Sequence, residues 1–163
     1  MDRIMTATAL DLERDHALLD LAAKAALRGH GHVEPNPMVG CVISSGSGDI
    51  IAADHHRMHG GPHAEVLALQ RAGDAAQGAT MHVTLEPCDH VGRTGPCTEA
   101  IIAAGVTRVV IGQRDPNPEA AGGIERLRAA GIEVELLEHG PSRQLLEPFL
   151  IRQTQQRPWV LAK

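Results

Sequence analysis

Aromatic side chains are almost missing from this chain of 163 residues, which holds one Trp, one Phe and no Tyr. Both aromatics, Phe149 and Trp159, lie near the C-terminal end, so there is no set of aromatic side chains on which a series of unpaired bases would stack. The formal net charge of −5 argues against a nucleic acid or an acidic membrane surface as partner. We therefore expect neither nucleic acid nor a membrane among the partners.

Long apolar segments are missing as well. No stretch approaches 18 apolar residues, the length that a membrane-spanning helix needs. The first 15 residues include six charged ones and no apolar core of the kind that a secretion signal has. The three cysteines are an odd number, which without such a signal favours thiols and metal ligands over disulfides. We expect one domain in a reducing, bacterial-type cytoplasm.

Strand and helix patterns alternate along most of the chain. Helices are expected over 11–28, 64–76, from 96 or 98 to 104, 120–130 and 142–153, and strands over 38–43, 50–53, 80–85, 107–111 and 132–137. Gly46 and Gly48 mark a turn between the first two strands, which predicts an antiparallel hairpin. The later strands are separated by helices, and right-handed crossovers would make them parallel. The fold class is therefore α/β.

The strongest chemical signal is a histidine followed two residues later by a glutamate, with two cysteines further on. Cys88 stands 25 residues after His63, and Cys97 follows Cys88 across eight intervening residues. One imidazole and two thiolates can hold a zinc ion whose fourth tetrahedral position stays open for water. Glu65, beside the histidine, is then the proton shuttle of a hydrolytic deaminase.

The expected helix starts also favour this chemistry. His63 directly precedes one predicted helix, and Cys88 and Cys97 flank the start of the next, so positive helix ends would stabilise thiolates. A structural zinc site is the alternative, but such sites usually have four protein ligands and closer cysteine pairs. Cys41 lies in an apolar strand, where a cysteine is usually a small buried hydrophobe rather than a ligand.

The residues around these ligands resemble the deaminase domain of the bifunctional riboflavin-biosynthesis deaminase/reductases. The matching segments are 35–43, 62–66, 84–97 and 115–118, together with His56 and Gly60. The resemblance covers about residues 11 to 150. The eight residues between the cysteines set this family apart from the tRNA deaminases, in which the two cysteines usually stand two apart.

The resemblance implies a cytidine-deaminase-like fold, a three-layer α/β/α sandwich on a mixed five-stranded sheet. It implies hydrolytic removal of the 2-amino group from 2,5-diamino-6-ribosylamino-4(3H)-pyrimidinone 5′-phosphate. By position, His63, Cys88 and Cys97 carry over as the ligands of one Zn²⁺ per chain and Glu65 as the acid/base. A homo-oligomer is also implied.

The family's substrate-contacting positions fall on Asn36, His56, Arg93, Asp115 and Asn117. Asn36 can donate to and accept from a pyrimidine edge or a ribose hydroxyl, and Arg93 suits a 5′-phosphate. Asp115 and Asn117 suit ribose hydroxyls, but a proline-rich turn that only caps the following helix remains the alternative. His56 is alternatively a plain surface histidine, and Asn36 alternatively only shapes its turn.

One departure from the family pattern and one further resemblance leave questions open. The glycine-rich loop after residue 118 is one residue short, and residues 157–163 resemble the first strand of the reductase domain. We therefore expect a deaminase domain over 1–150, a tail over 151–163, and no reductase activity, whether the chain is a fragment or a standalone enzyme with a separate or deleted reductase. Two other functions stay open: a zinc deaminase of another small aminopyrimidine, purine base or nucleoside, and a non-catalytic zinc module that docks onto a reductase.

Overall fold

A five-stranded mixed sheet forms the centre of the protein. The structure, a computed structural model, describes residues 8–91 and 95–157. The strand order is β2-β1-β3-β4-β5, with β1 and β2 antiparallel, β1 and β3 antiparallel, and β3, β4 and β5 parallel. The strands are β1 (Gly40–Ser44), β2 (Ile50–His55), β3 (Thr80–Val83), β4 (Arg108–Ile111) and β5 (Glu133–Leu136). The predicted hairpin, parallel later strands and mixed sheet are confirmed.

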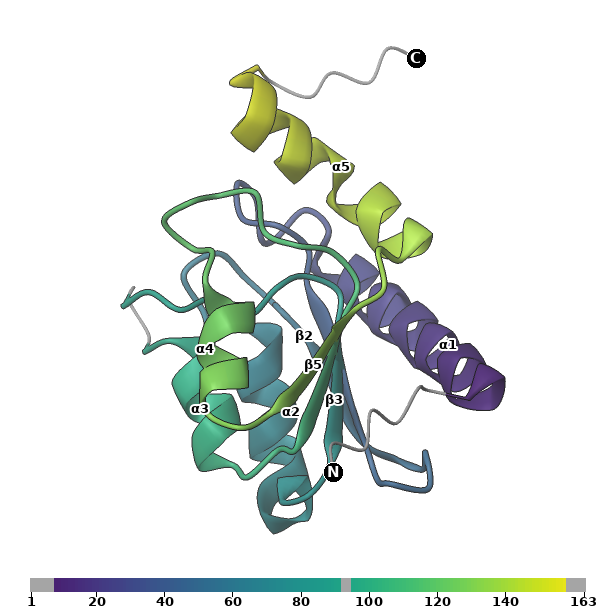
Figure 1. Cartoon of the computed structure of the whole chain (residues 1–163). Helices are drawn as coiled ribbons and strands as arrows, with labels where there is room; N and C mark the ends of the chain where they lie inside the picture. Colours follow the sequence, from purple (N-terminus) through teal and green to yellow (C-terminus); the bar gives the residue numbers. More distant parts are fainter. Residues whose placement is uncertain (1–7, 92–94, 158–163) are drawn as a thin grey trace.

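Helices cover both faces of this sheet and complete three layers (Figure 1). Helix α1 (Ala9–Ala26) lies on one face, and α2 (Ala64–Ala72), α3 (Cys97–Ala103) and α4 (Gly123–Ala129) lie on the other. Short 3-10 turns, Leu27–Gly29 and Gly73–Ala76, extend α1 and α2. The predicted three-layer α/β/α architecture on a mixed five-stranded sheet is confirmed.

Alternation along β1 divides the core between the two faces. Cys41 belongs to the large apolar cluster that includes residues of α2, α3 and α4, whereas Val42 packs with Leu18 and Ala22 of α1. An added Cβ at Gly40 would lie 1.9 Å from the Ala22 carbonyl oxygen, so only glycine lets α1 approach β1 this closely. Cys41 is fully buried, as its apolar strand predicts, and burial raises the pKa of its thiol.

Three helices start elsewhere than the periodicity predicts, and one of them, the last described helix, begins two residues early, at Gly140. Helix α1 begins two residues early because Thr8 and Asp11 form a capping box: the Asp11 N–H donates to the Thr8 hydroxyl at 3.2 Å, and the Thr8 N–H donates to the Asp11 carboxylate at 3.3 Å. Helix α4 begins three residues late, at Gly123. The reason lies in the loop around Glu86 and is described with the site below.

The last described helix, α5 (Gly140–Gln155), begins beside α1 and projects past the end of the sheet (Figure 1). It runs across residue 150 without interruption, and the expected domain boundary there stays a prediction. Residues 158–163, most of the segment that resembles a reductase strand, lie outside the described residues.

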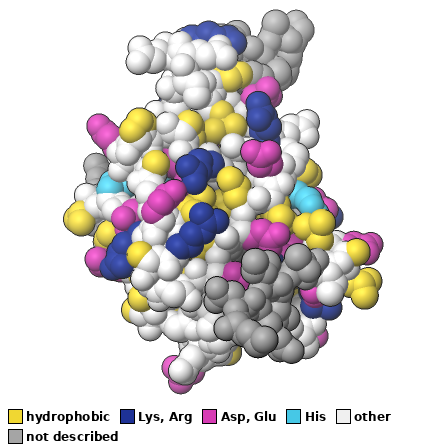
Figure 2. Space-filling view, viewed as in Figure 1, with side chains coloured by type: hydrophobic (Ala, Val, Ile, Leu, Met, Phe, Trp, Pro, Cys, Tyr) yellow, Lys and Arg dark blue, Asp and Glu magenta, His cyan; other side chains and the backbone are white. Residues whose placement is uncertain are grey.

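The surface in Figure 2 mixes acidic and basic side chains rather than gathering one sign of charge on the face shown. None of the helices in the described ranges, 8–91 and 95–157, combines the length and the apolar composition that a membrane crossing needs.

Candidate metal centre and substrate cavity

Two helix starts and one loop bring the three predicted metal ligands together. His63 is the N-cap residue of α2, Cys97 is the first residue of α3, and Cys88 lies in the loop after β3. The Nδ1 atom of His63 lies 3.2 Å from Cys97 Sγ and 3.6 Å from Cys88 Sγ. All three donor atoms lie within 4.8 Å of one another. Because the imidazole turns toward the cysteines, it makes no capping hydrogen bond to α2.

These distances fit a tetrahedral zinc ion. Zinc bonds of ordinary length to one nitrogen and one sulfur, at a tetrahedral angle, place those two atoms about 3.6 Å apart. The observed nitrogen-to-sulfur separations of 3.2 and 3.6 Å are close to that edge length. An imidazole and two thiolates are also the donors that zinc prefers, and with three protein ligands one position stays open to solvent or substrate.

The surroundings of the two cysteines favour a thiolate on Cys88. The pKa of Cys88 is lowered, chiefly because the Cys97 side chain donates a hydrogen bond to it, and that of Cys97 is raised for the same reason. The backbone N–H of Cys97, at the positive end of α3, also donates to Cys88 Sγ at 3.5 Å. The hydrogen bond with Cys88 raises the pKa of His63.

Thr98 fixes the loop that carries Cys88, the metal-ligand loop, to α3. Its hydroxyl donates to the Asp89 carboxylate at 2.6 Å, and its backbone N–H donates to the Cys88 carbonyl oxygen at 3.3 Å. Thr98 is completely buried. This side chain therefore holds Cys88 against the helix that carries Cys97, a role that the sequence motif did not reveal.

Glu65 lies at the base of the same cavity. It is the second residue of α2, its exposed fraction is 3%, and it lines the cavity together with His63 and Cys88. Burial raises the pKa of Glu65 to about 6. A carboxyl group with a pKa near neutrality both takes and gives protons readily, which is what a proton shuttle requires.

The cavity has a volume of about 410 Å³ and gathers four of the five predicted substrate contacts. Asn36, His56, Asp115 and Asn117 all line it. The fifth, Arg93, lies outside the described residues. The structure thus brings together predicted contact residues from three separate segments of the chain, and their contacts with a substrate stay predictions.

His56 is a buried partner of Asn36 rather than a surface histidine. Its exposed fraction is 3%, its Nδ1 lies 2.9 Å from the Pro62 carbonyl oxygen, and its Nε2 lies 3.4 Å from Asn36 Nδ2. A carbonyl oxygen can only accept, so the ring proton sits on Nδ1 and Nε2 accepts from the Asn36 amide. Burial lowers the pKa of His56, which favours this neutral ring. Among the described residues nothing donates to the amide oxygen of Asn36, which can accept from a ligand.

The loop after β4 forms two local turns. The Asn117 N–H donates to the Asp115 carboxylate at 2.8 Å, and the Glu119 N–H donates to the Asn117 side-chain oxygen at 3.1 Å. Neither side chain caps α4, whose N-cap residue is Gly122. Burial raises the pKa of Asp115.

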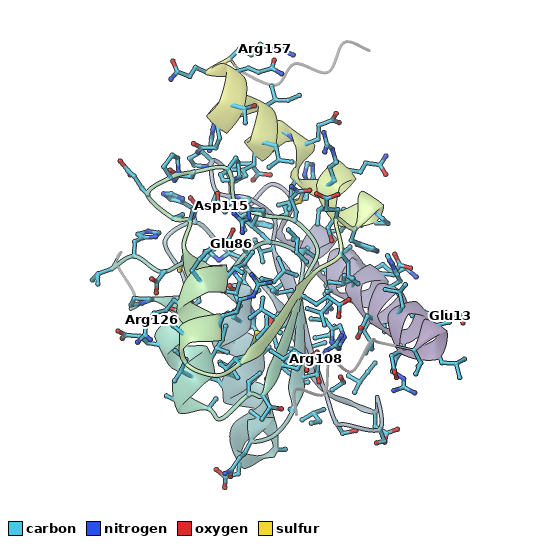
Figure 3. The ribbon with its side chains drawn as sticks, viewed as in Figure 1. Glu13, Glu86, Arg108, Asp115, Arg126 and Arg157 are labelled. Atoms are coloured by element: carbon cyan, nitrogen blue, oxygen red, sulfur yellow. The ribbon has the colours of Figure 1, made fainter. Side chains whose placement is uncertain are left out.

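Glu86 takes the capping role instead, from a different loop. Its Oε1 accepts the N–H groups of Gly122 at 3.3 Å and Ile124 at 3.2 Å, while its Oε2 accepts the N–H of Asp115 at 3.1 Å. Figure 3 shows the labelled Glu86 and Asp115 next to each other between α4 and α5. Gly123 packs directly on the metal-ligand loop that carries Cys88, since an added Cβ would lie 1.9 Å from the Pro87 carbonyl oxygen. The shortened glycine loop is therefore tied to the metal-ligand loop at two places.

Sequence reasoning missed several residues of this site. Glu86 stands two positions before Cys88 within the matched segment, but no local pattern shows that its carboxylate is buried against another loop. Three residues of α5 also line the cavity: Phe149, Arg152 and Gln153. They come from a helix that carries no motif, so only the folded chain reveals them.

Comparison with known proteins agrees with this geometry. The family described as the cytidine and deoxycytidylate deaminase zinc-binding region matches residues 12–113. This chain belongs to that family. The matched region contains the whole His63, Cys88 and Cys97 cluster, so the candidate site coincides with the part of the chain that defines a zinc-binding deaminase.

Among its relatives are riboflavin biosynthesis proteins. The RibD protein of Aquifex aeolicus is 47% identical over 153 residues, covering 93% of this chain and 43% of that protein, and RibD of Escherichia coli is 48% identical over 155 residues, covering 92% and 41%. The crystal structure of a diaminohydroxyphosphoribosylaminopyrimidine deaminase/5-amino-6-(5-phosphoribosylamino)uracil reductase from Thermotoga maritima superimposes with a TM-score of 0.86 at 43% identity, covering 90% of this chain and 43% of that one. The resemblance predicted from the sequence is confirmed, and the chain spans about two fifths of the length of these curated relatives.

Proposed function

We propose that this zinc-binding deaminase hydrolyses the 2-amino group of 2,5-diamino-6-ribosylamino-4(3H)-pyrimidinone 5′-phosphate in riboflavin biosynthesis and uses one zinc ion per chain. The observation that carries the proposal is the meeting of His63, Cys88 and Cys97 beside the buried Glu65 at the base of one cavity. The relatives that share most of this chain support the choice of substrate, because they are riboflavin biosynthesis proteins.

Glu65 would carry the protons of the reaction. His63, Cys88 and Cys97 would hold the zinc, which when bound would supply a polarised water that is nucleophilic near neutral pH. Glu65 takes one proton from the attacking water and delivers it to the ring nitrogen next to the reacting carbon. It then passes the second proton to the amino group, which leaves as ammonia while a carbon–oxygen bond replaces the carbon–nitrogen bond. Burial, which raises the pKa of Glu65 to about 6, suits both transfers.

The other cavity residues would orient the ring and the sugar. The Asn36 amide, fixed by the neutral His56, presents its oxygen to a donor on the pyrimidine or ribose. Asp115 and Asn117 face the same cavity from the loop that Glu86 holds in place, where they would bind ribose hydroxyls. Orientation of this kind lowers the barrier because the reacting carbon is already placed before the attack.

The test is a comparison of substrates on zinc-loaded protein. Ammonia release from the diaminopyrimidine phosphate should exceed release from cytidine, dCMP and guanine, and metal analysis should give one zinc per chain. Preferential turnover of a nucleoside or a free base would instead favour the alternative substrate class. The homo-oligomer expected from the resemblance stays a prediction, which light scattering on the same sample measures.

A further inference from the structure

Helix α5 closes one side of the cavity with side chains that no motif of this chain accounts for. Phe149, Arg152 and Gln153 line the cavity from the second half of this helix. Phe149 is partly buried and packs against the main core, which fixes the helix to the body of the protein. The Arg152 guanidinium donates through Nη2 to the Pro35 carbonyl oxygen, directly before Asn36. This contact ties Arg152 to the turn that carries a predicted substrate contact.

Arg152 supplies a positive charge to a cavity whose other charged lining residues are acidic. Among the described residues that line the cavity, Arg152 is the only arginine or lysine, whereas Glu65, Glu86 and Asp115 all contribute carboxyl groups. A phosphate monoester carries about two negative charges near neutral pH. Three carboxyl groups would repel such a group, so its binding in this cavity needs a cation.

The surroundings of Arg152 leave it able to bind a phosphate. A guanidinium has five N–H donors, and the contact with Pro35 occupies one nitrogen, Nη2. The remaining donors keep the fork geometry that matches two phosphate oxygens. The side chain is half-buried, so a ligand in the cavity can reach it while the contact with Pro35 restricts its motion.

We propose that Arg152 binds the 5′-phosphate of the substrate and so sets the preference of this enzyme for a phosphorylated over an unphosphorylated ribosylaminopyrimidine. The proposal rests on the proposed function and adds a residue to it. It also assigns the second half of α5 to the deaminase site. Arg93, predicted from the sequence to hold the same phosphate, is the competing candidate and lies outside the described residues.

The primary test compares KM and kcat for the phosphorylated substrate and its dephosphorylated form. In Arg152→Ala, KM for the phosphorylated substrate should rise about tenfold or more, the usual effect of losing a charge-assisted hydrogen bond. Its kcat should change little, because such a contact exists before and during the reaction. Arg152→Lys, which keeps the charge but loses the fork, should recover part of the loss. Arg143→Ala is the matched control, since Arg143 is an exposed arginine of α5 that does not line the cavity.

A second measurement separates this proposal from the proposed function. Calorimetric titration of the zinc-loaded protein with ribose 5-phosphate and with ribose should show tighter binding of the phosphate, lost in Arg152→Ala and kept in Arg143→Ala. That pattern in a protein that fails to deaminate the diaminopyrimidine would refute the proposed function and support the role of Arg152. The role is overturned if ribose 5-phosphate binds no more tightly than ribose, or if Arg93→Ala removes that difference while Arg152→Ala keeps it. It is also overturned if Arg152→Ala lowers kcat/KM equally for the phosphorylated and the dephosphorylated substrate.

Discussion

The Oε2 atom of Glu86 lies 3.1 Å from the backbone nitrogen of Asp115 and accepts its N–H. The other carboxylate oxygen accepts the N–H groups that start α4. One side chain in the metal-ligand loop therefore fixes both a predicted substrate loop and the helix that follows it. The geometry of the cavity depends on this buried carboxylate as much as on the residues that face the ligand.

Glu86→Gln should weaken both the fold and substrate binding. The amide has only one acceptor oxygen, so at least one N–H of Asp115, Gly122 or Ile124 loses its partner, at a cost of about 1–3 kcal/mol in the free energy of unfolding. The loop that carries Asp115 loosens, and KM rises more than kcat falls. Urea unfolding and steady-state kinetics measure the two effects. Glu147→Gln, an exposed change on α5, is the control; equal stability of both variants would contradict this role for Glu86.

Gly123→Ala should separate α4 from the metal-ligand loop. The new Cβ would lie 1.9 Å from the Pro87 carbonyl oxygen, so the backbone must move. We expect a loss of about 1–3 kcal/mol in the free energy of unfolding, the typical cost of overpacking, and a lower affinity for zinc. Gly140→Ala is the matched control, because nothing lies within 4 Å of an added Cβ there. Thermal unfolding and zinc titration distinguish the two, and a Gly123→Ala protein as stable as the control would count against the close contact.

The buried Asp15 should make stability depend on acid pH. Burial alone would raise its pKa, but hydrogen bonds from His82 and Arg108 outweigh burial and lower the pKa to about 2. Because the folded pKa lies below the unfolded value, this carboxylate stabilises the protein above about pH 4, by about 2 kcal/mol, and the contribution disappears as the pH falls to 2. Arg108 lies at the end of the sheet opposite Glu86 (Figure 3), so this effect is separate from the active site.

The check on Asp15 is urea unfolding between pH 6 and pH 2. Asp15→Asn should be less stable than the wild type near neutral pH, and the difference should shrink toward pH 2. Asp74→Asn, an exposed change, should follow the wild type at every pH. A difference between Asp15→Asn and the wild type that stays constant over this range would show that the ionised carboxylate contributes nothing.

Removal of zinc should lower stability as well as activity. In the proposed site the metal would bind residues that start two helices and one residue of a loop, so its binding energy would add to the stability of that arrangement. We expect a chelator to lower the unfolding temperature by several degrees and added zinc to restore it. In Cys88→Ser the restoration should fail, whereas Cys41→Ala, which removes a thiol elsewhere, should keep its zinc. Restoration in Cys88→Ser would remove Cys88 from the ligand set.

Local patterns in the sequence predicted the sheet and the metal cluster well. The apolar runs are short and lie close to turn residues such as Pro37, Gly46 and Gly112, so each strand is found within a few residues of its position. His63, Cys88 and Cys97 could be found because each stands at a helix start or in a short matched segment. The expected order of parallel and antiparallel strands followed from turn length and crossover handedness.

The rest depends on contacts between distant segments. The start of α4 was predicted three residues early, because its cap is the carboxylate of Glu86 rather than a residue of its own loop. Arg152 was missed because α5 reaches the cavity only after folding. No pattern within one helix or one loop reports such a contact.

The most direct test of the whole account is ammonia release from freshly generated 2,5-diamino-6-ribosylamino-4(3H)-pyrimidinone 5′-phosphate by zinc-loaded wild type and by Glu65→Gln. Both proteins should fold alike and bind one zinc per chain, because Glu65 is not a member of the ligand cluster. The account predicts ammonia from the wild type and at least a hundredfold slower release from Glu65→Gln, since a positioned proton shuttle contributes about 10² or more to the rate. Undiminished release by Glu65→Gln, or no release by the zinc-loaded wild type, would contradict it.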